Sequence, residues 1–142
     1  LVEPKVAPLA KALRKISEFG YIDEDAAREA IDRLGEFNFI DPETGVKVDF
    51  WIMKKTPAGR SEFERRIIKK IDGQEVSFIS PEDLVLNKLL WYQKSLSSRH
   101  LEDAESVLKI SGEKLDKKYL KLWAKKLGVA DVLTKLLKGN KP

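Results

Sequence analysis

This sequence of 142 residues is long enough to bury the core of one domain, and it contains no cysteine. The absence of cysteine excludes disulfides and thiolate metal sites, and it is typical of a cytoplasmic protein. The net charge is +4, and no run approaches the roughly 18 consecutive apolar residues of a membrane-spanning helix, so we expect no membrane contact.

The positive charge gathers at the C-terminal end of the chain. From Lys109 to Pro142 there are ten lysines and three acidic residues, which gives a local charge of +7. Such a segment can attract nucleotides or a phosphate backbone, or it can be the solvated surface of helices. Few arginine or aromatic residues stand between the lysines, so the pattern favours the solvated surface.

Two helices are expected at the start of the chain. The first covers residues 4–19, where apolar residues recur at helical spacing. Gly20 follows in the position at which helices commonly end. Asp23 is the predicted N-cap of a second helix, which ends at Gly35.

Two β-hairpins follow the helices. The first pairs EFNFI with VKVDFWIM across the turn DPETG, in which Gly45 permits a positive φ. Its second strand alternates, with one face formed by Val46, Val48, Phe50 and Ile52 and the other by Lys47, Asp49, Trp51 and Met53. The second hairpin pairs RRIIKKI with EVSFI around residues 72–74.

The C-terminal half is predicted to be helical from Ser80 onward. Ser80 is the expected N-cap, Pro81 the first helical residue, and Asp83 a negative charge in the first turn. Glycines mark the ends of the three helices that follow it, at Gly112, Gly128 and Gly139. This order of elements predicts an α+β fold with a small mixed or antiparallel sheet of about four strands, flanking helices and a helical C-terminal half.

Asp49 is the residue that the strand pattern leaves unexplained. A strand disfavours aspartate unless a partner, a metal or solvent compensates its charge, so Asp49 is either an exposed residue without a role or a working one. Lys88 interrupts an apolar helix face and can reach outward to solvent. Arg99 and Asp103 stand four residues apart on the next predicted helix and can form an ion pair.

Other kinds of site have no support in the sequence. His100 is the only histidine, so no metal site can be built from histidines. There is no G-x-S-x-G elbow, no Walker loop and no G-x-G-x-x-G motif. Hydrolase triads and dinucleotide-binding enzymes are therefore not indicated.

Three stretches, taken together, resemble a known family. They are FNFIDPETGVKVDFWIM, VSFISPEDLVLNKLLWY and SSRHLEDAESVLKI, which span most of residues 37–110. In this order and spacing they resemble the minimal nucleotidyltransferases of the DNA polymerase β superfamily, some of which are toxin–antitoxin components. The resemblance implies that residues 1–80 are a partial nucleotidyltransferase-like α+β core and that residues 81–142 are the C-terminal helical part of the same domain.

The resemblance also implies roles for the candidate residues. Asp49 matches the third catalytic carboxylate of the family, a metal-binding residue that a hairpin strand carries between apolar neighbours. Lys88 matches a lysine that faces the phosphates of the nucleotide. Arg99 and Asp103 match the nucleotide-binding helix with the pattern R-D-x-x-D, in which His100 replaces the commoner aspartate.

The implied chemistry is nucleotidyl transfer with Mg²⁺ as the cofactor. Two divalent cations clamp the attacking and leaving oxygens, and Mg²⁺ prefers carboxylate and phosphate oxygens as ligands. The implied partners are a nucleoside triphosphate and an acceptor, which in such families is a protein, an RNA or a small molecule. Nothing in the sequence selects the acceptor or the nucleotide.

The family's Gly-Ser helix start and its D-x-D strand do not occur in this sequence. Asp23 and Asp25 frame Glu24, but they lie at a predicted helix start rather than in a strand. Because the chain opens on Leu1 rather than methionine, we expect that it lacks an N-terminal part of the protein. We therefore expect Mg²⁺ to be bound only by the complete protein.

Three functions remain open from the sequence. The complete protein can be a metal-dependent nucleotidyltransferase, of which this chain alone is inactive because it has one of three catalytic carboxylates. The chain can instead be a degenerate, non-catalytic module that binds a protein partner, a nucleotide or RNA through its basic C-terminal helices. It can also be a scaffold in which Asp49 is merely exposed.

The oligomeric state is also open, and a homo-oligomer is one alternative. Four large aromatic residues in the helical half can be core residues or interface anchors, and the core is favoured. They are Trp91, Tyr92, Tyr119 and Trp123.

Overall fold

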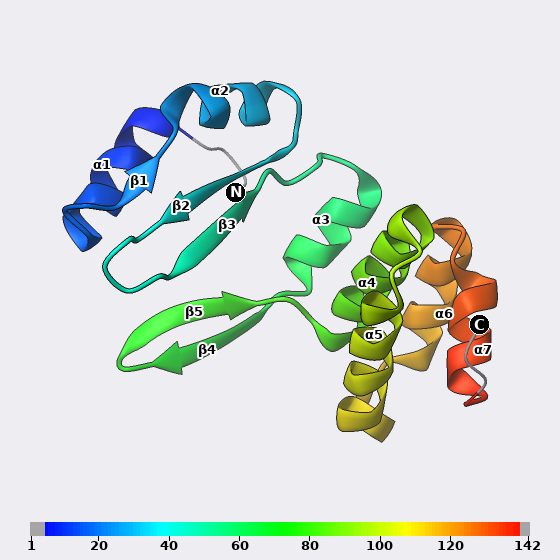
Figure 1. The fold of residues 1–142 in the computed structure, drawn as a ribbon. Helices are drawn as coiled ribbons and strands as arrows, with labels where there is room; N and C mark the ends of the chain where they lie inside the picture. The colour runs from blue at the N-terminus through cyan, green and yellow to red at the C-terminus, as the bar shows by residue number, and fades with distance from the viewer. Residues whose placement is uncertain (1–4, 140–142) are drawn as a thin grey trace. The chain divides into compact units, whose positions relative to one another are not determined.

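The computed structural model describes residues 5–139 and divides the chain into two compact units, Leu1–Gly59 and Arg60–Pro142. The described residues form seven α-helices, a three-stranded sheet and a two-stranded sheet, both antiparallel (Figure 1). The α+β class predicted from the sequence is therefore confirmed. Among residues 5–139, no helix has the length and apolar character needed to cross a membrane.

The first unit contains two helices and the three-stranded sheet. Its elements are α1 (Val6–Ile16), β1 (Tyr21–Ile22), α2 (Glu24–Asp32), β2 (Glu36–Ile40) and β3 (Lys47–Trp51). The strand order is β1-β2-β3, so β3 lies at one edge of the sheet. The predicted hairpin is present, with β2 and β3 as its strands.

The core of this unit lies between the helices and one face of the sheet. Phe37 and Phe50 are paired in register, and their rings stack with centroids 5.1 Å apart. The buried residues of this core are Ala10, Leu13, Ile22, Ala27, Ala30, Phe37, Phe39 and Ile52. Asp23 caps α2 as predicted, because its side chain accepts hydrogen bonds from the backbone N–H groups of Asp25 and Ala26.

The predicted end of the first helix was wrong. Helix α1 ends at Ile16, and the side chain of Ile16 is 79% exposed rather than part of the apolar face. Gly20 lies beyond the helix end, where its backbone packs directly against the ring of Phe39, and a Cβ at this position would collide with that ring. The glycine therefore serves close packing instead of ending the helix.

The second hairpin has almost no cover from the rest of its own unit. Helix α3 (Pro57–Glu64) precedes β4 (Ile67–Ile71) and β5 (Gln74–Phe78), which pair with Ile67 opposite Phe78. All ten residues of these two strands are exposed. The strands were predicted, but they form a sheet of their own rather than one sheet with the first hairpin.

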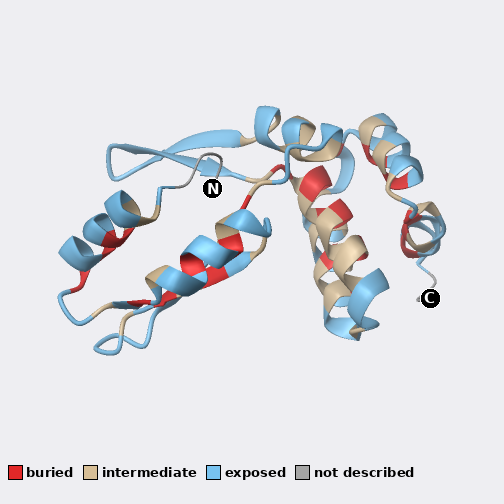
Figure 2. Cartoon of the chain, turned by 90° about the horizontal axis from the view of Figure 1, so that it is seen from above, coloured by how far each residue is buried: buried red, intermediate tan, exposed pale blue. Residues whose placement is uncertain are grey.

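The rest of the second unit is helical. It contains α4 (Pro81–Ser95), α5 (Ser98–Ser111), α6 (Lys117–Lys126) and α7 (Ala130–Leu137), with a short 3₁₀ turn at Gly112–Lys114. Figure 2 colours the buried positions of these helices red, among intermediate positions in tan and exposed ones in pale blue. The buried core is Val85, Leu86, Leu89, Leu101, Ala104, Leu120, Ala124, Val129, Leu133 and Leu136.

Local signals at the helix ends agree with the structure. Ser80 is the N-cap of α4, and its Oγ accepts a hydrogen bond of 3.1 Å from the backbone N–H of Asp83. Helices α5, α6 and α7 end just before Gly112, Gly128 and Gly139. Three of the four aromatic residues discussed above pack, partly buried, against the helical core: Tyr92, Tyr119 and Trp123.

Candidate functional site

Asp49 lies on the face of β3 that points away from the core. Phe50 packs on the core and Ile52, beyond the strand, is buried. Val48, on the same predicted apolar face, is 39% exposed, so the alternation expected from the sequence is present only at the end of the strand. The side chain of Asp49 is 52% exposed, and its Oδ1 lies 2.9 Å from the Nζ of Lys47. These two residues are neighbours on one face, and an exposed pair of this kind contributes little to stability.

The residues present do not by themselves fit a two-Mg²⁺ centre. In the part of the chain that the structure describes, no group of three or more His, Cys, Asp or Glu side chains is placed to hold a metal ion. Asp49 offers one carboxylate, and that carboxylate is paired with Lys47. One carboxylate does not supply the oxygen ligands of two Mg²⁺ ions, so the described residues do not complete such a centre at Asp49.

Lys88 and Asp103 are brought together between α4 and α5. The Nζ of Lys88 donates a hydrogen bond of 2.6 Å to Oδ2 of Asp103, and it also lies 5.2 Å from the centre of the Trp91 ring. The Lys88 side chain is 21% exposed and that of Asp103 is 40% exposed. Lys88 is thus held by an ion pair instead of reaching freely into solvent.

Arg99 stands one helical turn before Asp103 on α5. The structure pairs Asp103 with Lys88, so the expected ion pair between Arg99 and Asp103 is replaced. The pKa of Asp103 is lowered, chiefly by the hydrogen bond from Lys88, while desolvation opposes this effect. The nearby charges of Lys88, Arg99 and His100 lower this pKa further.

The four residues singled out from the sequence do not all fall in one unit. Asp49 belongs to the first unit, whereas Lys88, Arg99 and Asp103 belong to the second. His100 lies beside the last group, with its ring centre 5.6 Å from that of Trp91. The structure therefore defines one charged cluster on α4 and α5 and, separately, one exposed carboxylate on β3.

A buried polar network around the start of α4 was not predicted from the sequence. Asp83, which is 4% exposed, accepts a 2.5 Å hydrogen bond from Oγ of Ser80 and a 2.7 Å hydrogen bond from the hydroxyl of Tyr119. The Oγ of Ser61 lies 2.9 Å from that hydroxyl. Because the tyrosine has one proton and gives it to Asp83, Ser61 is the donor in the second contact.

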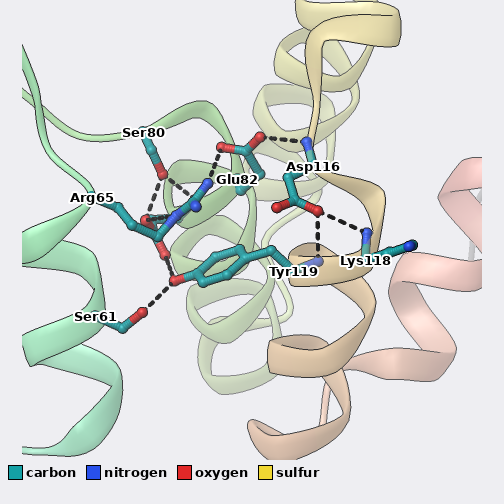
Figure 3. Close-up of polar contacts among 8 residues, drawn as sticks. Ser61, Arg65, Ser80, Glu82, Asp116, Lys118 and Tyr119 are labelled. Atoms are coloured by element: carbon teal, nitrogen blue, oxygen red, sulfur yellow. Dashed lines mark hydrogen bonds and ion pairs between the residues drawn. The ribbon is translucent and has the colours of Figure 1, made fainter.

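Arg65 completes this network by contacting two buried carboxylates. Its Nη2 donates a 3.1 Å hydrogen bond to Glu82, and its Nε lies 3.7 Å from Oδ2 of Asp83 (Figure 3). The guanidinium group also stacks over the Tyr119 ring, 3.8 Å from its centre. Glu82 in turn accepts a 2.7 Å hydrogen bond from the backbone N–H of Asp116, the N-cap of α6.

The network of hydrogen bonds around Asp83 has a structural role. The carboxylates of Glu82 and Asp83 accept hydrogen bonds from Arg65 in the segment after α3, from the N-cap of α4, and from the N-cap and first turn of α6. Ser61 adds α3 through the Tyr119 hydroxyl, so the network holds these elements together. Burial raises the pKa of Tyr119 to about 12; the hydrogen bond to Asp83 also raises it, and the one from Ser61 lowers it. The tyrosine is therefore a hydrogen-bond donor at neutral pH and not a base.

Comparison of the chain with protein-family models, curated proteins and solved structures finds no match in any of the three.

Part of the network had a signal in the sequence. Ser80 and Asp83 have the spacing of a capping box, in which the side chain three residues after the N-cap bonds back to it. Arg65 and Tyr119 had no such signal, because they reach Asp83 from distant parts of the chain. Glu82 was likewise indistinguishable from an ordinary acidic residue in a first helical turn.

Proposed function

We propose that this chain is part of a nucleotidyltransferase-like protein, in which the α4–α5 cluster binds a nucleoside triphosphate and Asp49 is a metal-binding carboxylate. The observation that carries the proposal is the cluster itself. Two cationic side chains, Lys88 and Arg99, act on the single carboxylate of Asp103. The cluster therefore has an excess positive charge that a phosphate group can neutralise.

Lys88 would change partner when a nucleotide binds. Its ammonium group is a compact, hydrated donor on a flexible stem, so it can turn from Asp103 to a phosphate oxygen. Arg99 is exposed on the first turn of α5 and offers a planar donor group that suits phosphate. Asp103 then limits binding by competing for Lys88, which the Asp103→Asn variant would relieve.

Asp49 supports the enzymatic part of the proposal by its position. Its carboxylate is exposed on a strand whose other face packs on the core, so the backbone that carries it is fixed. Only an exposed lysine would have to move aside for a cation to approach. The proposal needs two further carboxylates, which the described residues do not provide at Asp49.

A second candidate is a non-catalytic module of the same fold that binds a protein partner, a nucleotide or RNA. The observation that favours it concerns the possible metal ligands: among residues 5–139, no group of three acidic, histidine or cysteine side chains could hold a metal. Under this candidate, nucleotide binding is retained and transfer is lost. In either case we propose a cytoplasmic protein, which the absence of cysteine supports.

The gene sequence upstream of Leu1 separates the two candidates. A Gly-Ser segment followed by a D-x-D strand there, together with transfer of a radiolabelled nucleotide by the protein expressed from the whole reading frame, would support the enzyme. A start codon at or near Leu1 would remove catalysis from the proposal. The 142-residue chain itself is expected to show no transfer and only weak Mg²⁺ binding by calorimetry, since one carboxylate cannot hold two ions.

A further inference from the structure

A groove with a volume of about 560 Å³ lies between α6 and α7 in the helical unit. Its base is apolar, formed by the buried side chains of Ala124 and Leu133 and by Leu137, which is 43% exposed. Three exposed lysines line it as well, Lys121 and Lys125 from α6 and Lys138 at the end of α7. Neither the nucleotide cluster nor Asp49 is part of this groove.

The charge of the groove has one sign. Its lining includes three lysines and no carboxylate, so nothing in the lining neutralises them. The described ion pairs of the protein involve other residues, such as Lys109 with Glu105 on α5. A partner with negative charge beside these lysines would be attracted at low salt and would bind less well as salt screens the field.

The shape of the groove suits a helix better than a compact ligand. Its lining comes from α6, from α7 and from Lys138, the residue that follows α7, and no third helix among residues 5–139 contributes to it. Grooves between two helices commonly receive an amphipathic helix, whose apolar residues at positions i, i+3, i+4 and i+7 enter the apolar base. The exposed Leu137 would lie against such residues.

We propose that the α6–α7 groove is a docking site for an acidic amphipathic helix of a partner protein. The apolar base takes the leucine-type side chains of the partner, and the three lysines contact glutamate or aspartate on its flanks. RNA is the weaker choice, because a phosphate backbone would be attracted to the lysines but would gain nothing from Leu133 and Leu137. The proposal is independent of nucleotide binding at Lys88.

The test is the binding of a fluorescein-labelled peptide of about 15 residues, long enough to form a helix when docked. It has leucines at the four helical positions above and glutamates at most others, and its binding to the 142-residue chain is measured by fluorescence anisotropy. Leu137→Ser and Lys121→Glu are each expected to weaken binding about tenfold. A matched peptide with lysines in place of the glutamates is expected not to bind.

Two control variants lie on α6 outside the groove. Leu122→Ser removes another exposed leucine, and Lys118→Glu reverses another exposed lysine, so both should leave the affinity unchanged. Circular dichroism confirms that all four variants are folded. The proposal is overturned if the peptide does not bind at concentrations up to about 1 mM, or if the controls weaken binding as much as the groove variants.

The last measurement uses a labelled single-stranded RNA with the same net charge as the acidic peptide. The surface is a diffuse cationic one if RNA binds more tightly than the peptide and if its affinity responds to charge alone. In that case Lys118→Glu weakens RNA binding as much as Lys121→Glu does, and Leu137→Ser leaves RNA binding unchanged. That result would also overturn the proposal. Weak RNA binding that is insensitive to all four variants, beside groove-dependent peptide binding, would support it.

Discussion

The hydroxyl of Tyr119 donates a 2.7 Å hydrogen bond to the buried carboxylate of Asp83, which links α6 to the first turn of α4. Arg65 stacks over the same tyrosine and contacts the same carboxylate. One aromatic side chain thus covers the partly exposed cation and donates a hydrogen bond to the buried anion of this pair.

Tyr119→Phe should lower the free energy of unfolding by about 1–3 kcal/mol, measured by urea denaturation. The change keeps the ring under Arg65 but removes a donor to a buried carboxylate, and a buried group that loses a partner has a cost of this order. Tyr92→Phe is the control, because Tyr92 is also partly buried against the helical core but takes no part in the network. Equal losses in the two variants would contradict the assignment.

Stability should also fall at high pH through Tyr119. Its folded pKa of about 12 lies above the ordinary value of 10.0, so the folded state holds the proton more tightly than the unfolded state does. This contribution is fully present below pH 10 and disappears as the pH rises through about 12. The free energy of unfolding, measured across this pH range, should decline more steeply for the native chain than for Tyr119→Phe. Parallel declines in the two proteins would exclude the raised pKa of Tyr119.

Arg65→Met should destabilise the protein by about 2–3 kcal/mol, because it leaves the carboxylates of Glu82 and Asp83 buried without their cation. This loss is smaller than the roughly 3–5 kcal/mol expected for a fully buried pair, because the Arg65 side chain is 32% exposed. Arg60→Met changes an exposed arginine close by and should shift stability by less than about 0.5 kcal/mol. A similar small shift for Arg65→Met would show that the pair is solvent-screened.

The elements whose ends carry a local signal were predictable from the sequence. Contacts within a few residues determine the N-caps Ser80 and Asp23 and the turn with Gly45. Their roles can therefore be predicted without knowledge of the fold. Strand β1 had no such signal, because Tyr21 and Ile22 are too few residues to show an alternation. The split of the strands into two sheets also depends on packing that no local pattern encodes.

The site residues divide in the same way. The alternation of its strand placed Asp49 on the face opposite Phe50, and its side chain is exposed, but the role of Asp49 was left open by the sequence and stays a prediction. The partner of Asp103 was not predicted. The sequence offered Arg99, four residues earlier on the same helix, as the partner, whereas Lys88 approaches from another helix. Contacts between helices need the interhelical geometry, which helical periodicity alone does not supply.

Asp49→Asn should change the stability of this chain by less than about 0.5 kcal/mol, since it removes only an exposed ion pair with Lys47. In a longer protein with the other two carboxylates, the same change should abolish nucleotidyl transfer without unfolding the protein. Asp32→Asn on α2 is the matched control and should leave transfer intact. Activity retained in the Asp49→Asn protein would remove Asp49 from the mechanism.

Calorimetric titration of the chain with ATP, GTP, CTP and UTP tests whether the α4–α5 cluster binds a nucleotide. We expect at least one triphosphate to bind, Lys88→Ala to weaken it about tenfold, and Asp103→Asn to leave it unchanged or tighter. Lys94→Ala, an exposed lysine on the same helix, should have no effect. No binding of any triphosphate to the native chain, or equal binding to the native and Lys88→Ala chains, would contradict the account.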